Sequence, residues 1–202
     1  MYKDIIELLT KKGTTTVGIV LKDAVILAAD KRAVAGYYIA HKRVKKILKI
    51  DDRIAITTAG LVADAQALVD IVKNEIKYYK LTINGEVSIK TVASILSNIL
   101  HTYKWFPFIV QLLVGGFDSA PRLYMLELFG AISEEKYAAT GSGSPIAIGV
   151  IEENYDENMK IDEAVDLAIR AIKMAMRRDT ATGEAVDVAI ITNKGIQERT
   201  IK

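Results

Sequence analysis

Lys46 is a candidate for chemistry because a predicted strand places its charge on an apolar face. Alternation through residues 44–50 puts Lys46 on the face that carries Val44, Leu48 and Ile50. Burying an ammonium group costs free energy unless the charge is paired, so this pattern predicts a carboxylate partner and a shifted pKa. A basic run on a solvated edge strand is the ordinary alternative.

Asp30 is the candidate partner of that lysine. It ends the uninterrupted apolar strand VILAA, where a carboxylate is a costly choice for a buried position. The run Gly13-Thr14-Thr15-Thr16 offers hydroxyl groups as nucleophiles, although β-branched threonine is also the ordinary residue of a half-exposed strand. Taken alone, neither feature establishes a site.

Composition narrows the chemistry. The chain has no cysteine, so any side-chain nucleophile must be an oxygen or an amine. Its two histidines, His41 and His101, stand outside any HExxH motif, which disfavours a histidine metal site and leaves few candidates for a Ser-His-Asp triad. The net charge of +2 gives no basic field suited to nucleic acid. We therefore expect neither a metal nor a cofactor, and no nucleic-acid partner.

Two polar loops are further candidates. Residues 141–145, GSGSP, are not a phosphate loop because GxxxxGK[ST] is absent, and Ser144 with Pro145 suits the N-cap and first residue of a helix. Residues 178–183, RDTATG, are typical of a helix that ends in a polar turn before glycine. Neither loop requires a function on its own.

The elements that must position these residues follow the order strands, helices, strands, helices, strands. Strands are predicted over 14–21, 25–30, 37–40, 44–50 and 53–59, as one strand-rich sheet. The rest of the chain predicts helices over 61–79, 88–103 and 161–178, strands over 108–116, 122–130 and 132–141, and a final hairpin from residue 186. Because βαβ alternation is absent, we expect an α+β fold, a four-layer α-β-β-α sandwich of two antiparallel sheets flanked by helices.

Length and hydropathy indicate a single soluble domain. The 202 residues fit one domain with a sizeable core. No stretch approaches the roughly 18 apolar residues that span a bilayer. Residues 1–13 lack the apolar core of a secretory signal. We therefore expect a cytoplasmic protein without a membrane partner.

Together, the motifs resemble those of archaeal proteasome β subunits. The resemblance runs from about Gly13 to the final hairpin and rests on GTTTVGI, the strand end at Asp30, HKRVKKI, AGLVADAQ, VQLLVGG, TGSGSP and the RDxAxG turn. It implies the N-terminal-nucleophile hydrolase fold, which is the sandwich that the pattern predicts. It also divides the chain into a propeptide, residues 1–13, and a catalytic domain, residues 14–202.

The resemblance implies that Thr14 is the nucleophile of a threonine endopeptidase. An N-terminal threonine carries its own base, an α-amine with a pKa of about 7.7–8.0, but this amine is free only after the bond between Gly13 and Thr14 is broken. The resemblance implies that this cleavage is autocatalytic and activates an inactive precursor. Lys46 would then supply positive charge beside the nucleophile, and Asp30 would orient Lys46.

Further roles also follow from the resemblance. The backbone N–H of Gly60 would donate to the oxyanion. Ser142, Asp179 and Thr182 would hold the α-amine and a nearby water, with Thr182 standing where the family usually has serine. The implied substrate pocket is small and apolar, which favours hydrophobic P1 residues. Its residues are Ala33, Val44, Leu48, Thr58 and Val62.

The same resemblance implies partners. Seven-membered β rings would stack between rings of α subunits in an α7β7β7α7 particle, with an ATP-dependent unfoldase docked on the α rings and unfolded polypeptides as substrates. Three alternatives remain: a poorly processed structural β subunit paired with a more active one, the simpler bacterial two-ring relative, and a nucleic-acid-binding module resting on HKRVKK. The bacterial type matches TGSGSP and RDxAxG less closely, and the near-neutral charge disfavours the third.

Overall fold

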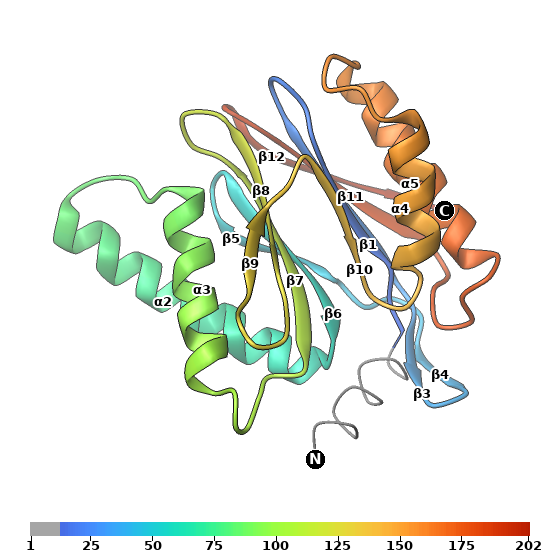
Figure 1. Cartoon of the computed structure of the whole chain (residues 1–202), viewed down its shortest axis with the longest axis horizontal. Coiled ribbons are helices and arrows are strands. Elements are labelled where there is room, and N and C mark those ends of the chain that lie inside the picture. Colours follow the sequence, from blue (N-terminus) through green and yellow to red (C-terminus); the bar gives the residue numbers. More distant parts are fainter. Residues whose placement is uncertain (1–12) are drawn as a thin grey trace.

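The computed structural model describes residues 13–202 and has four layers (Figure 1). Two five-stranded antiparallel sheets lie face to face. The first has the order β10-β1-β2-β11-β12, with β1 (Thr16–Val20), β2 (Val25–Asp30), β10 (Tyr137–Thr140), β11 (Val186–Thr192) and β12 (Gly195–Ile201). The second has the order β5-β6-β7-β8-β9, with β5 (Ile47–Asp51), β6 (Ile54–Gly60), β7 (Val110–Phe117), β8 (Pro121–Leu126) and β9 (Ile132–Glu134). The predicted α+β sandwich is confirmed.

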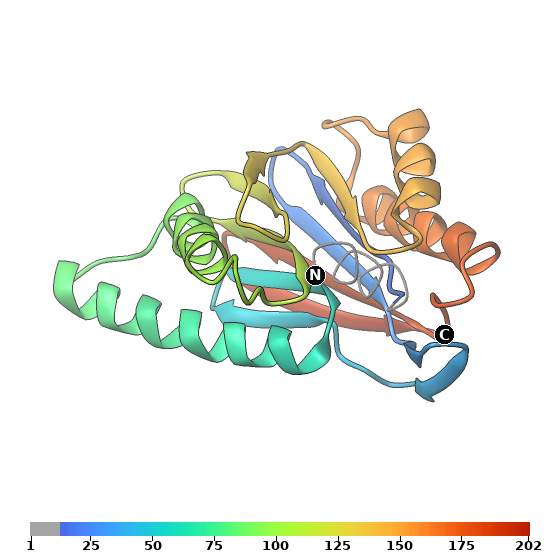
Figure 2. The same cartoon turned by 60° about the horizontal axis from the view of Figure 1, so that its bottom comes forward.

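Two helices cover each outer face of the sandwich (Figure 2). The second sheet is covered by α2 (Val62–Ile83) and α3 (Ile89–Thr102), and the first by α4 (Ser144–Asn154) and α5 (Ile161–Met176). The sequence placed the N-cap of α4 at Ser144, but the helix begins there and the cap is Gly143, which makes no side-chain cap bond. Within residues 13–202, no helix is long and apolar enough to cross a membrane.

Three apolar clusters hold the layers together because each strand alternates its side chains between two faces. One cluster lies between the sheets and includes Leu27 of β2, Leu113 of β7 and Leu123 of β8. The second joins the second sheet to α2 and α3, and the third joins the first sheet to α4 and α5. Apolar burial on both faces of each sheet therefore fixes the stacking.

The first sixty residues do not form one sheet as predicted. β1 and β2 belong to the first sheet and β5 and β6 to the second, while β3 (Ala33–Ala35) and β4 (Tyr38–His41) pair only with each other. This small hairpin projects from the end of the sandwich (Figure 1). The prediction was wrong because hydrophobic alternation identifies strands but does not say which strands pair.

Antiparallel pairing brings several chain segments to that same end. Thr16 at the start of β1 pairs with Thr140 at the end of β10, and Asp30 at the end of β2 pairs with Val186 at the start of β11. The hydroxyl of Thr16 also lies 2.8 Å from the hydroxyl of Thr57 on the second sheet. The strand ends of both sheets thus meet where the candidate site residues lie.

Candidate active site

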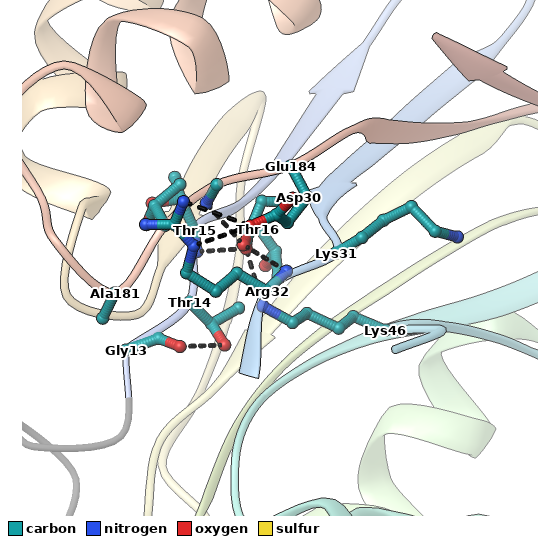
Figure 3. A network of polar contacts seen from close by, with 12 residues as sticks. Gly13, Thr14, Thr15, Thr16, Asp30, Lys31, Arg32, Lys46, Ala181 and Glu184 are labelled. Atoms are coloured by element: carbon teal, nitrogen blue, oxygen red, sulfur yellow. Dashed lines mark hydrogen bonds and ion pairs between the residues drawn. The ribbon is translucent and has the colours of Figure 1, made fainter. Parts of the chain in front are cut away.

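Asp30 and Lys46 form a buried ion pair. Lys46 Nζ lies 2.7 Å from Asp30 Oδ1, and the two residues are 4% and 0% exposed. Lys46 precedes β5 by one residue, yet its carbonyl accepts the N–H of Thr58, which extends the strand pairing. Figure 3 shows the amino end of Lys46 beside Asp30 and Thr14. The pairing matches the carboxylate partner that the apolar strand face predicted, and the alternative of a solvated lysine is excluded.

Backbone N–H groups complete the surroundings of the Asp30 carboxylate. Its Oδ1 accepts the N–H of Thr15, and its Oδ2 accepts those of Arg32 and Gly183, each at 3.0 Å. A buried carboxylate is stable when its oxygens receive such donors. Asp30 therefore joins the residue before β1, the segment after β2 and the loop before β11 at one point.

Burial and charge act against each other on Lys46. Burial lowers the pKa of Lys46 below its ordinary value, and this is the largest effect. The carboxylates of Asp30 and Asp179 oppose it, while the guanidinium of Arg32 adds to it. The ammonium group consequently titrates below the range of an exposed lysine.

Thr14 is held between its neighbour in the chain and the loop after β10. Its hydroxyl donates to the carbonyl oxygen of Gly13 at 2.8 Å, and its backbone N–H donates to Ser142 Oγ at 3.3 Å. The residue is 4% exposed. With the bond to Gly13 intact, the Thr14 nitrogen is an amide, and the hydroxyl lies beside the carbonyl group that its attack would require.

Asp179 orders the hydroxyl groups around Thr14. Its Oδ2 accepts a hydrogen bond from Ser142 and another from Thr182, both at 2.5 Å, so each of these hydroxyls has used its proton. Ser142 Oγ is therefore an acceptor towards the Thr14 nitrogen, and Thr182 Oγ1 is an acceptor towards Thr15 Oγ1, 2.6 Å away. The structure places Ser142 against the Thr14 nitrogen and connects Asp179 to Ser142 and Thr182, while the roles of these three residues in holding the α-amine and a water stay a prediction.

Two glycines allow close backbone approach beside Thr14. Gly60 has φ +127°, and a Cβ there would lie 2.1 Å from the carbonyl oxygen of Ile109. Gly141 has φ +90°, and a Cβ there would lie 2.1 Å from the carbonyl oxygen of Thr14. Both positions therefore require glycine. The oxyanion role of Gly60 stays a prediction.

A cavity of about 260 Å³ opens in front of Thr14 and Lys46. Its apolar wall comes from β3, β5, β6 and the start of α2, with Gly60 at its edge. The lining includes every residue of the predicted substrate pocket, namely Ala33, Val44, Leu48, Thr58 and Val62. The structure brings these residues together, while their contacts with a substrate stay a prediction.

Sequence reasoning missed several residues that shape the site. Arg32 Nη1 donates to the carbonyl of Thr180 at 2.8 Å, and its guanidinium pairs with Glu184 Oε1 at 3.3 Å. The side chain of Gln111 accepts the N–H of Gly141. A lone arginine or glutamine within a long chain gives no pattern that identifies such long-range partners.

Arg32 should position the loop that carries Asp179 and Thr182. We expect Arg32→Met to lower kcat about tenfold with little change in KM. A hydrogen bond from a charged group contributes about 1.5–3 kcal/mol. A tenfold change in rate corresponds to about 1.4 kcal/mol of activation free energy. The measurement is the rate of peptide hydrolysis, the activity that the resemblance implies. Arg122→Met is the matched control, since Arg122 pairs with Glu134 on β9, outside this network. An equal loss of kcat in both variants would contradict the positioning role.

Nothing in the described part of the chain suggests a metal centre. Residues 13–202 contain no group of three or more His, Cys, Asp or Glu side chains arranged to hold an ion. All buried side-chain nitrogen and oxygen atoms of those residues have hydrogen-bond partners. The arrangement instead combines a hydroxyl, a buried cation and ordered hydrogen-bond acceptors, which suits nucleophilic attack on a carbonyl carbon.

Two antiparallel sheets stacked between two pairs of helices are the fold of the N-terminal-nucleophile hydrolases. The proteasome subunit family matches residues 10–191, and the chain belongs to this family. It is 58% identical over 188 residues to a proteasome subunit beta 2 of Ignicoccus hospitalis, covering 93% of this chain and 89% of the relative. It is also 53% identical over 195 residues to a proteasome subunit beta 2 of Aeropyrum pernix, covering 96% and 89%.

Proposed function

We propose that the protein is a proteolytic β subunit of a 20S proteasome core, acting as a threonine endopeptidase with Thr14 as its nucleophile. The observation that carries this proposal is the position of the Thr14 hydroxyl, 2.8 Å from the Gly13 carbonyl oxygen and beside the buried Lys46–Asp30 pair. The family membership and the apolar cavity in front of Thr14 support it.

The first step is removal of residues 1–13, of which residues 1–12 lie outside the described part of the chain. The Thr14 oxygen attacks the Gly13 carbonyl carbon, the carbon–nitrogen bond breaks, and the proton of the hydroxyl passes to the departing nitrogen. This leaves an ester on the Thr14 oxygen and a free α-amine. Water then hydrolyses the ester, which releases the propeptide with a carboxyl group on Gly13 and restores the hydroxyl.

In the mature form, the α-amine acts as the base, which is the role of histidine in a Ser-His-Asp triad. Ser142 Oγ accepts one of its N–H bonds because the proton of Ser142 is directed to Asp179. The lone pair of the amine is then available to the Thr14 hydroxyl, directly or through water. The positive charge of Lys46 lowers the pKa of both groups, and the backbone N–H of Gly60 stabilises the oxyanion.

The residues that line the cavity favour a hydrophobic P1 residue, and the proposed ring assembly confines the substrate. The cavity presents mainly apolar side chains, and its two lysines, Lys45 and Lys46, are already paired with Glu198 and Asp30, so neither is free to pair with an acidic P1 group. Assembly with α subunits follows from the family, and we propose two β rings between two α rings, with an ATP-dependent unfoldase that delivers unfolded chains. The cytoplasm is the proposed location.

Covalent labelling tests the nucleophile. Assembled particles are incubated with a hydrophobic peptide that carries an electrophilic carbonyl at its C-terminus, and the labelled residue is located by mass spectrometry. We expect one adduct on the peptide that begins with Thr14 and parallel loss of peptidase activity. An inactivated particle with the label on another residue, or an active particle with Thr14 fully labelled, would overturn the proposal.

A further inference from the structure

Ala181 lies against Gly13 at the point of cleavage. Figure 3 shows it beside Gly13, on the loop between α5 and β11. A Cβ added to Gly13 would lie 1.7 Å from the Cβ of Ala181, 3.0 Å from its Cα and 2.7 Å from Ser142 Oγ. Contacts under 3.0 Å between such atoms do not occur without movement of one partner. Any side chain at residue 13 must therefore displace either the loop or Gly13 itself.

Hydrogen bonds hold the Ala181 side of this contact in place. The N–H of Ala181 donates to Asp179 Oδ1 at 3.2 Å, and the neighbouring carbonyl of Thr180 accepts from Arg32 at 2.8 Å. On the other side, the N–H of Gly183 donates to Asp30 Oδ2 at 3.0 Å. Retreat of the loop would break the bond to the Asp30 carboxylate and the bond from Arg32.

The position of the Gly13 carbonyl depends on a contact with the next residue in the chain. Its oxygen accepts from the Thr14 hydroxyl, which is the contact that aligns the carbonyl for attack. Because the bonds of Thr180 to Arg32 and of Gly183 to Asp30 oppose retreat of the loop, a side chain at residue 13 would displace this carbonyl from the hydroxyl. Because attack requires the reacting atoms at about 3–3.5 Å, a shift of this kind slows cleavage strongly.

We propose that Ala181 determines the specificity of self-processing, by admitting only glycine at the residue before the cleaved bond. The inference rests on the proposed cleavage between Gly13 and Thr14 and adds the residue that restricts it. A substitution at residue 13 affects the precursor alone, because the mature chains of wild type and of such a variant are identical from Thr14 onwards.

A reciprocal pair of substitutions tests this contact. Wild type, Gly13→Ala, Ala181→Gly and the double variant are assembled with α subunits, and the fraction of full-length chain is followed by intact mass. We expect Gly13→Ala to slow cleavage at least about 100-fold, since a misplaced reacting group has effects of this size. In the double variant, we expect cleavage to recover at least about tenfold. Recovery stays partial because the added Cβ still lies 2.7 Å from Ser142 Oγ.

The matched control is Gly13→Ala combined with Ala120→Gly, which removes a methyl group from the turn between β7 and β8. The fraction of full-length chain is measured in assembled particles alone, which excludes misfolded chains. Gly13→Ser serves as a second variant if Gly13→Ala fails to assemble. Cleavage of Gly13→Ala at the wild-type rate, or no more recovery with Ala181→Gly than with Ala120→Gly, would overturn the role of Ala181 alone. Wild type that remains uncleaved would overturn the proposed function as well.

Discussion

Replacement of Thr14 by alanine is expected to abolish peptide hydrolysis by the assembled particle, with a loss of at least about 10⁴-fold, as for other enzymes that lose their nucleophile. The physical reason is that the substitution removes the hydroxyl beside Gly13 and Lys46, and the chain has no cysteine that could replace it as nucleophile. The measurement is hydrolysis of a hydrophobic fluorogenic peptide at saturating concentration.

The substitution should leave the fold intact. Among residues 13–202, Thr14 Oγ1 hydrogen-bonds only to the adjacent Gly13 carbonyl, so its removal breaks no hydrogen bond between distant elements of this part of the chain. Thr14→Ser is the matched control because it keeps the hydroxyl, and we expect it to retain activity within about one order of magnitude. If Thr14→Ala particles hydrolysed the peptide at the wild-type rate with an unchanged unfolding temperature, Thr14 would not be the nucleophile.

Loss of the Lys46 charge is the second large effect that we expect. Lys46→Met leaves Asp30 as a buried carboxylate without its cation, and removal of one partner from a buried pair destabilises a protein by about 3–5 kcal/mol. Activity should fall by up to about 10³-fold, the upper end of the range for loss of one electrostatic group that stabilises a developing charge. Lys45→Met is the control, since Lys45 pairs with Glu198 at the surface.

The pH profile separates the charge of Lys46 from its packing. The charged form is needed for activity, and burial lowers the pKa of Lys46, so activity should fall as the pH rises through a value below that of a free lysine. On the acidic side, activity should rise as the α-amine loses its proton. Because arginine stays charged, Lys46→Arg particles that retain activity should lose the alkaline fall. An unchanged alkaline fall in that variant would assign it to another group.

The sequence predicted the layers and the central ion pair because both depend on local burial. The apolar run that ends in Asp30, and the apolar strand face that carries Lys46, are each visible in a few neighbouring residues. Either charge alone had an ordinary explanation. Their placement within 2.7 Å of each other required the pairing of β2 with β11 and the stacking of the two sheets.

The remaining parts of the site depend on contacts between distant segments. The β3–β4 hairpin was predicted as part of one larger sheet, because periodicity does not specify partners. Arg32 gave no signal, and Ala181 stood in the RDxAxG turn without a role of its own, since their importance arises from the backbone carbonyl of Thr180 and the missing side chain of Gly13. Such contacts become visible only once the loop before β11 has been placed in space.

The most direct test of the central claim is the N-terminus of the protein after co-assembly with its α subunits, read by intact mass and N-terminal sequencing for wild type and Thr14→Ala. We predict that wild type begins at Thr14 and that the variant keeps residues 1–13. Wild type that stays full length in folded, assembled particles would contradict the account, and the protein would then be a structural subunit of the β ring.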